Sequence, residues 1–225
     1  MVEPPAVSSA TKRPALETLY HHYLESENSA EFIRSVSSRY MLCTLERLAR
    51  YGDHVSKRAA VMSLGYLGDF RHNATLGRAL HDRDRAVRLL ADNGIRQLWF
   101  RDGNTSQRQR LEIVSHLNAS NHHQAAYRAA SELIEEAPWL AETWNQRGIA
   151  LFGQERFEDA ANDCHQTLEL NPYHFGAAVG MAHCYLEMED PLAALECFRR
   201  AVKLNPDLEE VRAQIDYLER SLEER

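Results

Sequence analysis

One short phrase recurs at a fixed distance, and this recurrence constrains the fold more than any other feature of the sequence. LELNP ends at Pro172 and VKLNP ends at Pro206, a separation of 34 residues. When frames that begin at Ala141 and Phe175 are superimposed, residues of similar character coincide along them. A period of this length is typical of folds that stack one small unit on the next and so bury a continuous core.

The pattern inside each frame predicts two antiparallel helices. Small residues let the two helices approach closely, while large apolar residues fill the space around the contacts. The small residues are Gly148, Ala160, Ala182 and Ala194, and the large ones are Trp144, Leu151, Tyr185 and Phe198. Asp190 and Pro191 form an N-cap and a first-turn proline. Asn171 and Asn205 suit a left-handed helix-ending position. The predicted helices are 142–153, 157–170, 176–188 and 191–204.

This pattern resembles the tetratricopeptide repeat, through the motifs Trp144-x-x-Arg147-Gly148-x-x-Leu151, Ala160-x-x-x-Cys164 and Pro172. The resemblance implies a domain over 104–225 with repeats at 141–174 and 175–208. A degenerate repeat at 107–140 has Arg110 and Val114 where the family has tryptophan and a small residue. An apolar stripe with 3-4-3-4 spacing predicts a capping helix over 208–223.

The first half of the chain has a different period, of 31 residues. Asp53, Lys57, Ala60, Leu64 and Leu67 recur as Asp84, Arg88, Ala91, Ile95 and Leu98. These stretches resemble HEAT-like repeats of the short bacterial kind also found in phycobilin lyases, over about 40–100. They depart from that pattern at Ser56 and Arg96. We expect HEAT-like helices over 19–103, with earlier helices near 19–25 and 30–51, after a disordered Pro/Ser-rich tail at 1–18. RDGNTSQ, residues 101–107, is expected to join the two repeat types.

The predicted fold is therefore all-α: a right-handed α-solenoid of antiparallel helix hairpins. In it, a HEAT-like stack continues into tetratricopeptide repeats and ends in a C-terminal capping helix.

The segment LHDRDRAVRLL, residues 80–90, raises the question of an anion-binding cluster. In the repeat reading, Asp82 or Asp84 caps a helix whose Val87 and Leu90 enter the core. The alternative is a basic patch that binds an anionic partner such as nucleic acid. It would consist of Arg78, Arg83, Arg85, Arg88, Arg96 and Arg101. Residues 39–110 carry 14 basic and 7 acidic side chains, but residues 111–225 carry 9 and 21, and this acidic half disfavours nucleic acid.

The sequence predicts neither an enzyme nor a metal or cofactor site. The histidines have no zinc-ligand spacing, and no phosphate-binding loop or nucleophile elbow is present. A lyase-like activity or a DNA glycosylase role follows only by weak analogy with HEAT-like families. The four cysteines fall inside helical patterns and are expected to be buried and reduced. No segment has the length of a membrane span or the pattern of a secretion signal, so we expect a cytoplasmic protein that does not contact membranes.

The tetratricopeptide resemblance implies a concave groove that binds a peptide. Carried over in register, its contact residues are Glu142, Asn145, Ile149, Phe152, Val179, His183 and Glu187. The lysines and arginines with which chaperone-binding members clamp a terminal carboxylate are missing from these positions. We therefore expect a protein–protein interaction adaptor or scaffold, whose partner presents a partly apolar, neutral or basic segment.

Overall fold

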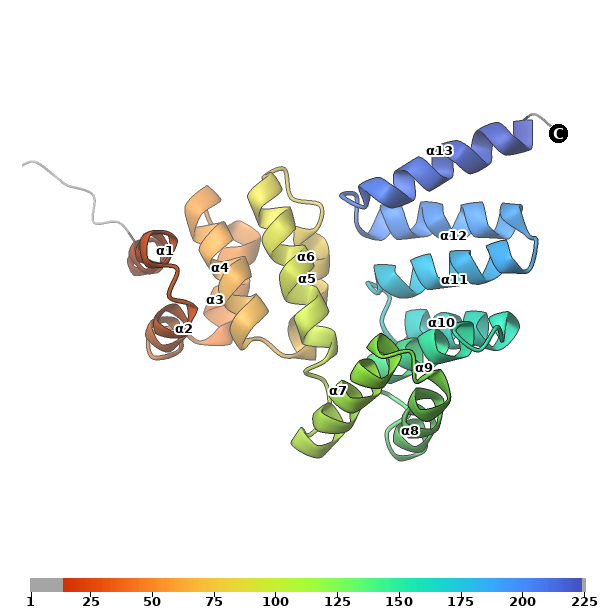
Figure 1. The fold of residues 1–225 in the computed structure, drawn as a ribbon. Helices are drawn as coiled ribbons and strands as arrows, with labels where there is room; N and C mark the ends of the chain where they lie inside the picture. Colours follow the sequence, from red (N-terminus) through yellow and green to blue (C-terminus); the bar gives the residue numbers. More distant parts are fainter. Residues whose placement is uncertain (1–13, 224–225) are drawn as a thin grey trace, which may run out of the picture.

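The computed structural model describes residues 14–223, and every regular element in that range is a helix (Figure 1). The predicted all-α class is confirmed. The α-helices are α1 (Ala15–Ser26), α2 (Ser29–Ser37), α3 (Leu42–Tyr51), α4 (His54–Leu67), α5 (Asn73–Ala79), α6 (Arg85–Trp99), α7 (Thr105–Ala119), α8 (His123–Glu136), α9 (Ala141–Phe152), α10 (Phe157–Leu170), α11 (Phe175–Glu187), α12 (Pro191–Leu204) and α13 (Glu209–Glu223). A short 3-10 turn, Phe70–His72, precedes α5.

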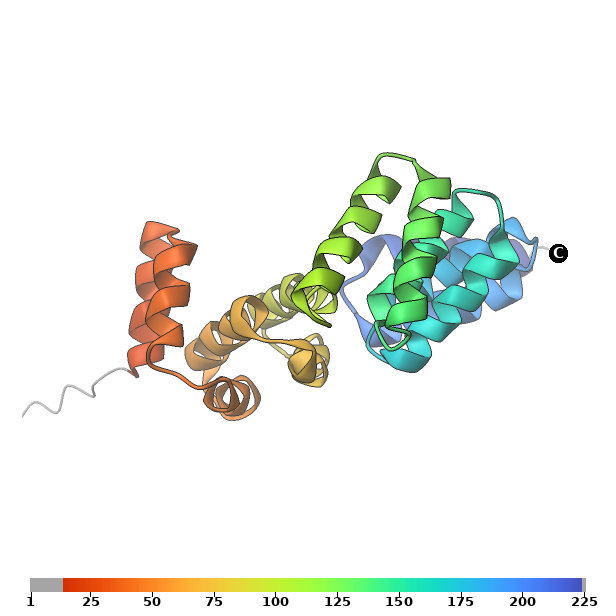
Figure 2. The same cartoon turned by 90° about the horizontal axis from the view of Figure 1, so that it is seen from below.

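The helices form two stacks, which we call the N-terminal stack (α1–α6) and the C-terminal stack (α7–α13). In the C-terminal stack each helix packs against the next one in the chain, from α7 through α13. In the N-terminal stack α4 is central and packs against α3 and α6. The two stacks lie at an angle, and the start of α13 returns toward α6 (Figures 1 and 2). This arrangement is the solenoid-like packing that the sequence predicts.

The 34-residue period is visible in the backbone itself. Asn121, Glu155 and Glu189 are spaced by this period, and each adopts a positive φ of 59° to 61°. The residue after each of them donates a backbone hydrogen bond across the turn. These bonds run from His122 to Leu117, from Arg156 to Leu151 and from Asp190 to Tyr185, with N···O distances of 2.8 to 3.0 Å. The same turn therefore closes three consecutive hairpins, including the one at 107–140 whose side chains are the most divergent.

The 31-residue period of the N-terminal stack also has a structural basis. Asp53 and Asp84 are the N-caps of α4 and α6, and each carboxylate accepts a nearby backbone N–H at 2.9 Å. The two helices cross where Gly65 meets Gly94. A Cβ on Gly94 would lie 2.9 Å from the Cα of Gly65, so this approach requires glycine. The helix-capping interpretation of LHDRDRAVRLL is correct, with Asp84 as the cap.

The four helices predicted over 142–204 are confirmed to within one residue at each end. The left-handed conformation predicted for Asn171 and Asn205 is wrong. Both are extended, with φ of −135° and −133°. Their side-chain oxygens instead accept the backbone N–H groups of Tyr173 and Asp207, each at 3.1 Å. Asparagine is used here for its side-chain acceptor rather than for its tolerance of positive φ.

The helices that precede the 31-residue repeat differ from the prediction. Helix α1 starts at Ala15, so it includes the last four residues of the tail predicted over 1–18. Residues 1–13 lie outside the described range. The single helix predicted over 30–51 is two helices, α2 and α3. The serine hydroxyls at the end of α2 donate back to main-chain carbonyls, and the chain at Met41 is extended. Such local bonds compete with continuation of a helix.

The connection between the stacks is shorter than predicted. Asn104 caps α7 in a reciprocal capping box with Gln107, so residues 105–107 belong to the first turn of the helix. Gly103 has a φ of 78°, which turns the chain between α6 and α7.

The core of the N-terminal stack extends into the C-terminal stack. Phe175, the first residue of α11, is 1% exposed and belongs to the same apolar cluster as Leu64, Ile95 and Leu98. The stacks therefore share buried apolar surface as well as polar contacts. Three of the four cysteines are buried thiols as predicted, but Cys43 on α3 is exposed, which corrects the expectation for that residue.

Candidate functional site

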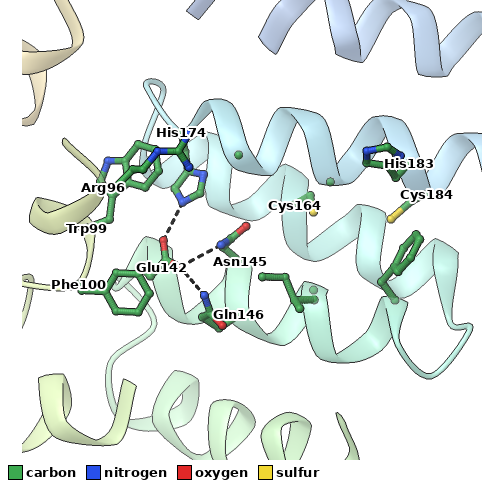
Figure 3. A pocket seen from close by; sticks show the side chains of 15 residues that line it. Arg96, Trp99, Phe100, Glu142, Asn145, Gln146, Cys164, His174, His183 and Cys184 are labelled. Carbon is green, nitrogen blue, oxygen red and sulfur yellow. Dashed lines mark hydrogen bonds and ion pairs between the residues drawn. The ribbon is translucent and has the colours of Figure 1, made fainter. Parts of the chain in front are cut away.

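The best candidate for a binding site is a cavity of about 440 Å³ between α9, α11 and the end of α6 (Figure 3). Helices α9 and α11 are the first helices of two consecutive 34-residue repeats and supply most of its walls. The lining residues are Arg96, Trp99, Phe100, Glu142, Asn145, Gln146, Gly148, Ile149, Phe152, Cys164, His174, Gly176, Gly180, His183 and Cys184. We call this cavity the groove.

The floor of the groove is made by residues without long side chains. Gly148 lies against α10, where an added Cβ would be 3.3 Å from the carbonyl oxygen of Ala160. An added Cβ on Gly180 would be 3.2 Å from Cys164 Sγ. The glycines therefore let α9 and α11 pack closely against α10 and the buried Cys164 at the base of the groove.

The N-terminal stack closes one end of the groove. The ring of Trp99 stacks on His174, with centroids 3.9 Å apart, and its Nε1 donates to Asn73 Oδ1 at 2.9 Å. Arg96 lies over the ring of Phe175, with its Cζ 4.5 Å from the centroid. This wall is built from residues of both stacks, so the groove depends on their docking.

Glu142 lies at the closed end, and its carboxylate is engaged inside the protein. It is 3% exposed, and its Oε1 accepts from Asn145 Nδ2 at 3.0 Å and from Gln146 Nε2 at 2.8 Å. His174 Nδ1 accepts the backbone N–H of Ala177 at 2.9 Å. His174 Nε2 must therefore carry the proton that bridges to Glu142 Oε2 at 2.8 Å. With three donors already bound, this carboxylate fixes the wall (Figure 3).

Two equivalent asparagines join the stacks. Asn171 Oδ1 accepts from Asn73 Nδ2, and Asn205 Nδ2 donates to Asp92 Oδ1, both at 2.7 Å. The two asparagines are 34 residues apart in the sequence. The same turn of two consecutive repeats thus docks on α5 and α6. An ion pair of 2.7 Å between Arg88 and Asp207 borders the second contact.

Five of the seven groove residues predicted from the sequence line this cavity: Glu142, Asn145, Ile149, Phe152 and His183. Val179 packs against the core of the C-terminal stack, and Glu187 is exposed at the end of α11; neither lines the cavity.

His183 is half-buried, with its ring edge-on to Phe198 at 5.3 Å between centroids. Burial lowers the pKa of His183, while nearby Glu187 opposes this shift. The histidine is therefore a neutral hydrogen-bonding group near pH 7.

The arginines of the predicted basic patch differ in their surroundings. Arg101 donates to the backbone carbonyls of Tyr66 and Gly68, and Arg88 pairs with Asp207. Arg96 contacts Asp92 and lines the groove. Arg78, Arg83 and Arg85 are exposed on α5, on α6 and in the loop between them. Half of the patch therefore has partners within the described residues.

Several lining residues escaped the sequence prediction, mainly because they belong to the wall between the stacks. Three of them, Trp99, Phe100 and His174, lie where the stacks meet, whereas Gln146 lies on α9 beside the predicted Asn145. The nearest signal in the sequence was the aromatic pair Trp99-Phe100 beside the arginines.

No group of three or more His, Cys, Asp or Glu side chains within residues 14–223 is placed to hold a metal ion. None of the helices described is long and apolar enough to cross a membrane.

Residues 151–215 match the family model of the tetratricopeptide repeat. This match confirms the predicted resemblance for the part of the chain that it covers: the end of α9, helices α10 to α12 and much of α13. The chain is also similar to a TPR repeat-containing protein of Rhizobium etli. The two are 25% identical over 141 residues, which is 63% of this chain and 68% of that protein.

Another curated protein and two solved structures are also similar to this chain. A DnaJ homolog subfamily C member 7 homolog of Dictyostelium discoideum is 27% identical over 100 residues, which is 43% of this chain but only 19% of that protein. The first TPR of Spaghetti (RPAP3), solved with an HSP90 peptide, has a TM-score of 0.49 and 16% identity, over 52% of this chain and 92% of that one. YrrB, a TPR protein described as having an unusual peptide-binding site, has a TM-score of 0.46 and 16% identity, over 89% and 98%. The fold assignment therefore rests on the helix pairs and the family match.

Proposed function

We propose that this protein is a non-enzymatic adaptor that binds an extended, partly apolar segment of another protein in the groove. The observation that carries the proposal is that one cavity combines exposed apolar side chains on its wall with glycines on its floor. Ile149 is 43% exposed and Phe152 is half-buried on the α9 wall, while the floor is glycine. Exposed apolar side chains around a concave site are typical of binding sites for apolar groups.

Polar groups in the same cavity can orient a peptide backbone. Asn145 uses Nδ2 to bind Glu142, and within residues 14–223 its Oδ1 has no hydrogen-bond partner. That oxygen can accept an N–H from a bound main chain, and the neutral ring of His183 offers a second polar contact. Peptide binding of this kind is what the tetratricopeptide match favours.

Two further points belong to the proposal. Residues 40–100 are HEAT-like, which the matching caps at Asp53 and Asp84 and the paired helices support. The protein is cytoplasmic, which the three buried, unpaired thiols support.

Selection from a phage-displayed random peptide library, followed by fluorescence anisotropy with the enriched peptides, tests the function. Ile149→Lys places a charge on the groove wall and should weaken binding at least tenfold. Ile113→Lys is the matched control, since Ile113 is 57% exposed on α7 and does not line the groove. Asn145→Ala should weaken the same peptides several-fold. Peptides that bind all three variants as tightly as the wild type would show that the groove is not the site.

A further inference from the structure

A second cavity, of about 590 Å³, lies on the other flank of α6. Leu90 and Asn93 line it from α6 and Tyr66 lines it from α4. Arg96 lines this cavity and the groove. Helix α6 therefore separates the two cavities, and Arg96 lines both of them.

The guanidinium of Arg96 is available to a partner. Its side chain is 48% exposed, and its Nε and Nη2 contact Asp92 at 3.3 Å each. An exposed ion pair of that length between residues four apart on a helix is weak. Within residues 14–223, Nη1 has no hydrogen-bond partner. Packing over Phe175 holds the side chain in place, so the charge is both positioned and incompletely paired.

Arg96 also lines a third cavity with Asp92, Asp207, Glu209 and Glu210. The linings of the two cavities on the flanks of α6 offer its charge no further free carboxylate. Glu142 is the only acidic residue among those that line the two cavities in the described range, and its oxygens already accept three hydrogen bonds. Arg101 lines the second cavity, but its guanidinium already donates hydrogen bonds to main-chain carbonyls. The group that best complements this surface is a carboxylate between two apolar side chains.

We propose that the bound segment crosses α6 and places an aspartate or glutamate side chain against Arg96, with an apolar side chain in the cavity on each flank. This inference rests on the proposed function and refines it, because it replaces the neutral or basic partner expected from the sequence with an acidic one. A helix is about 10 Å wide and an extended chain rises about 3.3 Å per residue, so the crossing needs about three residues.

The test uses the full chain and peptides selected from the random library. The wild type should enrich peptides that contain one acidic residue flanked by bulky apolar residues. Replacing that acidic residue by its amide in a labelled peptide should weaken binding about tenfold, which corresponds to the loss of a charge-assisted hydrogen bond. Arg96→Glu should reverse the preference from acidic to lysine- or arginine-containing peptides while the apolar preference remains.

Arg85→Glu is the matched control. Arg85 is exposed on the same face of α6, about 16 Å along the helix, and lines neither cavity. The inference is overturned if the Arg96→Glu protein still selects acidic peptides. It is also overturned if Arg85→Glu reverses the charge preference of the selected peptides as much as Arg96→Glu does. If Ile149→Lys abolishes binding but Arg96→Glu leaves the preference unchanged, the groove stands and only the acidic contact is wrong. If neither variant affects binding, the proposed function is wrong as well.

Discussion

The rings of Trp99 and His174 lie 3.9 Å apart and 20° from parallel, one at the end of the N-terminal stack and the other at the start of α11. On one side, Trp99 donates a hydrogen bond to Asn73, which donates one to Asn171. On the other side, His174 reaches Glu142. Buried polar groups that hydrogen-bond to one another specify one arrangement because each loses its partner when another moves. The two stacks are therefore docked in one geometry, and the groove wall is a product of that docking.

Replacement of Trp99 should destabilise the protein through this contact. Trp99→Phe keeps an aromatic ring beside His174 but removes the donor to Asn73, so the free energy of unfolding should fall by about 1–3 kcal/mol. Urea unfolding measures the loss. Trp139→Phe is the control: Trp139 is 56% exposed, and its change should stay within about 0.5 kcal/mol. Equal effects of the two substitutions would contradict a structural role for the hydrogen bond from Trp99 to Asn73.

The crossing of α4 and α6 makes a second prediction about stability. Gly94→Ala places a Cβ 2.9 Å from the backbone of Gly65, so the helices must separate. Overpacking of this kind costs about 1–3 kcal/mol, which exceeds the gain of about 1 kcal/mol from replacing glycine within a helix. Gly176→Ala meets its nearest neighbour, His174, at 3.4 Å, and should be neutral or stabilising. Thermal unfolding of both variants gives the comparison, and a stable Gly94→Ala protein would show that the helices can move apart freely.

The sequence predicts the helices of the C-terminal stack well because their signals are local. Small residues, N-caps and the proline after each asparagine all act within a few residues of where they stand. The same locality explains the errors. The local pattern predicts a left-handed conformation for Asn171 and Asn205, whereas long-range docking on α5 and α6 and their own side-chain turns set their conformation.

The groove could be predicted only in part, for the same reason. The inner faces of α9 and α11 follow from the repeat register, which placed Asn145, Ile149, Phe152 and His183. The wall made by Arg96 and the two aromatic residues after it depends on how one stack meets the other. No periodicity within either half of the chain contains that information. The sequence places Arg96 only in a charged patch, and its position beside the groove is a property of the tertiary structure.

The four cysteines should differ sharply in reactivity. Cys43 is exposed, whereas Cys164, Cys184 and Cys197 are buried. Burial raises the pKa of Cys197 to about 11, so at pH 8 only about one thiol in a thousand is the reactive thiolate. Treatment of the folded protein with a maleimide should therefore modify Cys43 first, with one label per chain by mass spectrometry. Unfolding in urea should raise the number to four. Rapid modification of Cys197 in the folded protein would contradict the burial.

Asp84 should contribute to the dependence of stability on pH. Its hydrogen bond from Arg58 lowers its pKa, against the opposing effect of burial, and the backbone N–H of Ala86 lowers it further. A carboxyl group with a lowered pKa contributes its full stabilisation of the folded state at pH values above its ordinary pKa. This contribution disappears as the pH falls through the lowered pKa.

Asp84→Asn keeps an N-cap residue but removes the charge that Arg58 pairs with. Because Arg58 is 38% exposed, the expected loss at pH 7 is only about 0.5 kcal/mol. The difference between variant and wild type should shrink below about pH 4 and in high salt, as measured by urea unfolding at pH 7, 5 and 3. A difference that stays constant across this range would assign the effect to the cap and not to the Arg58 ion pair.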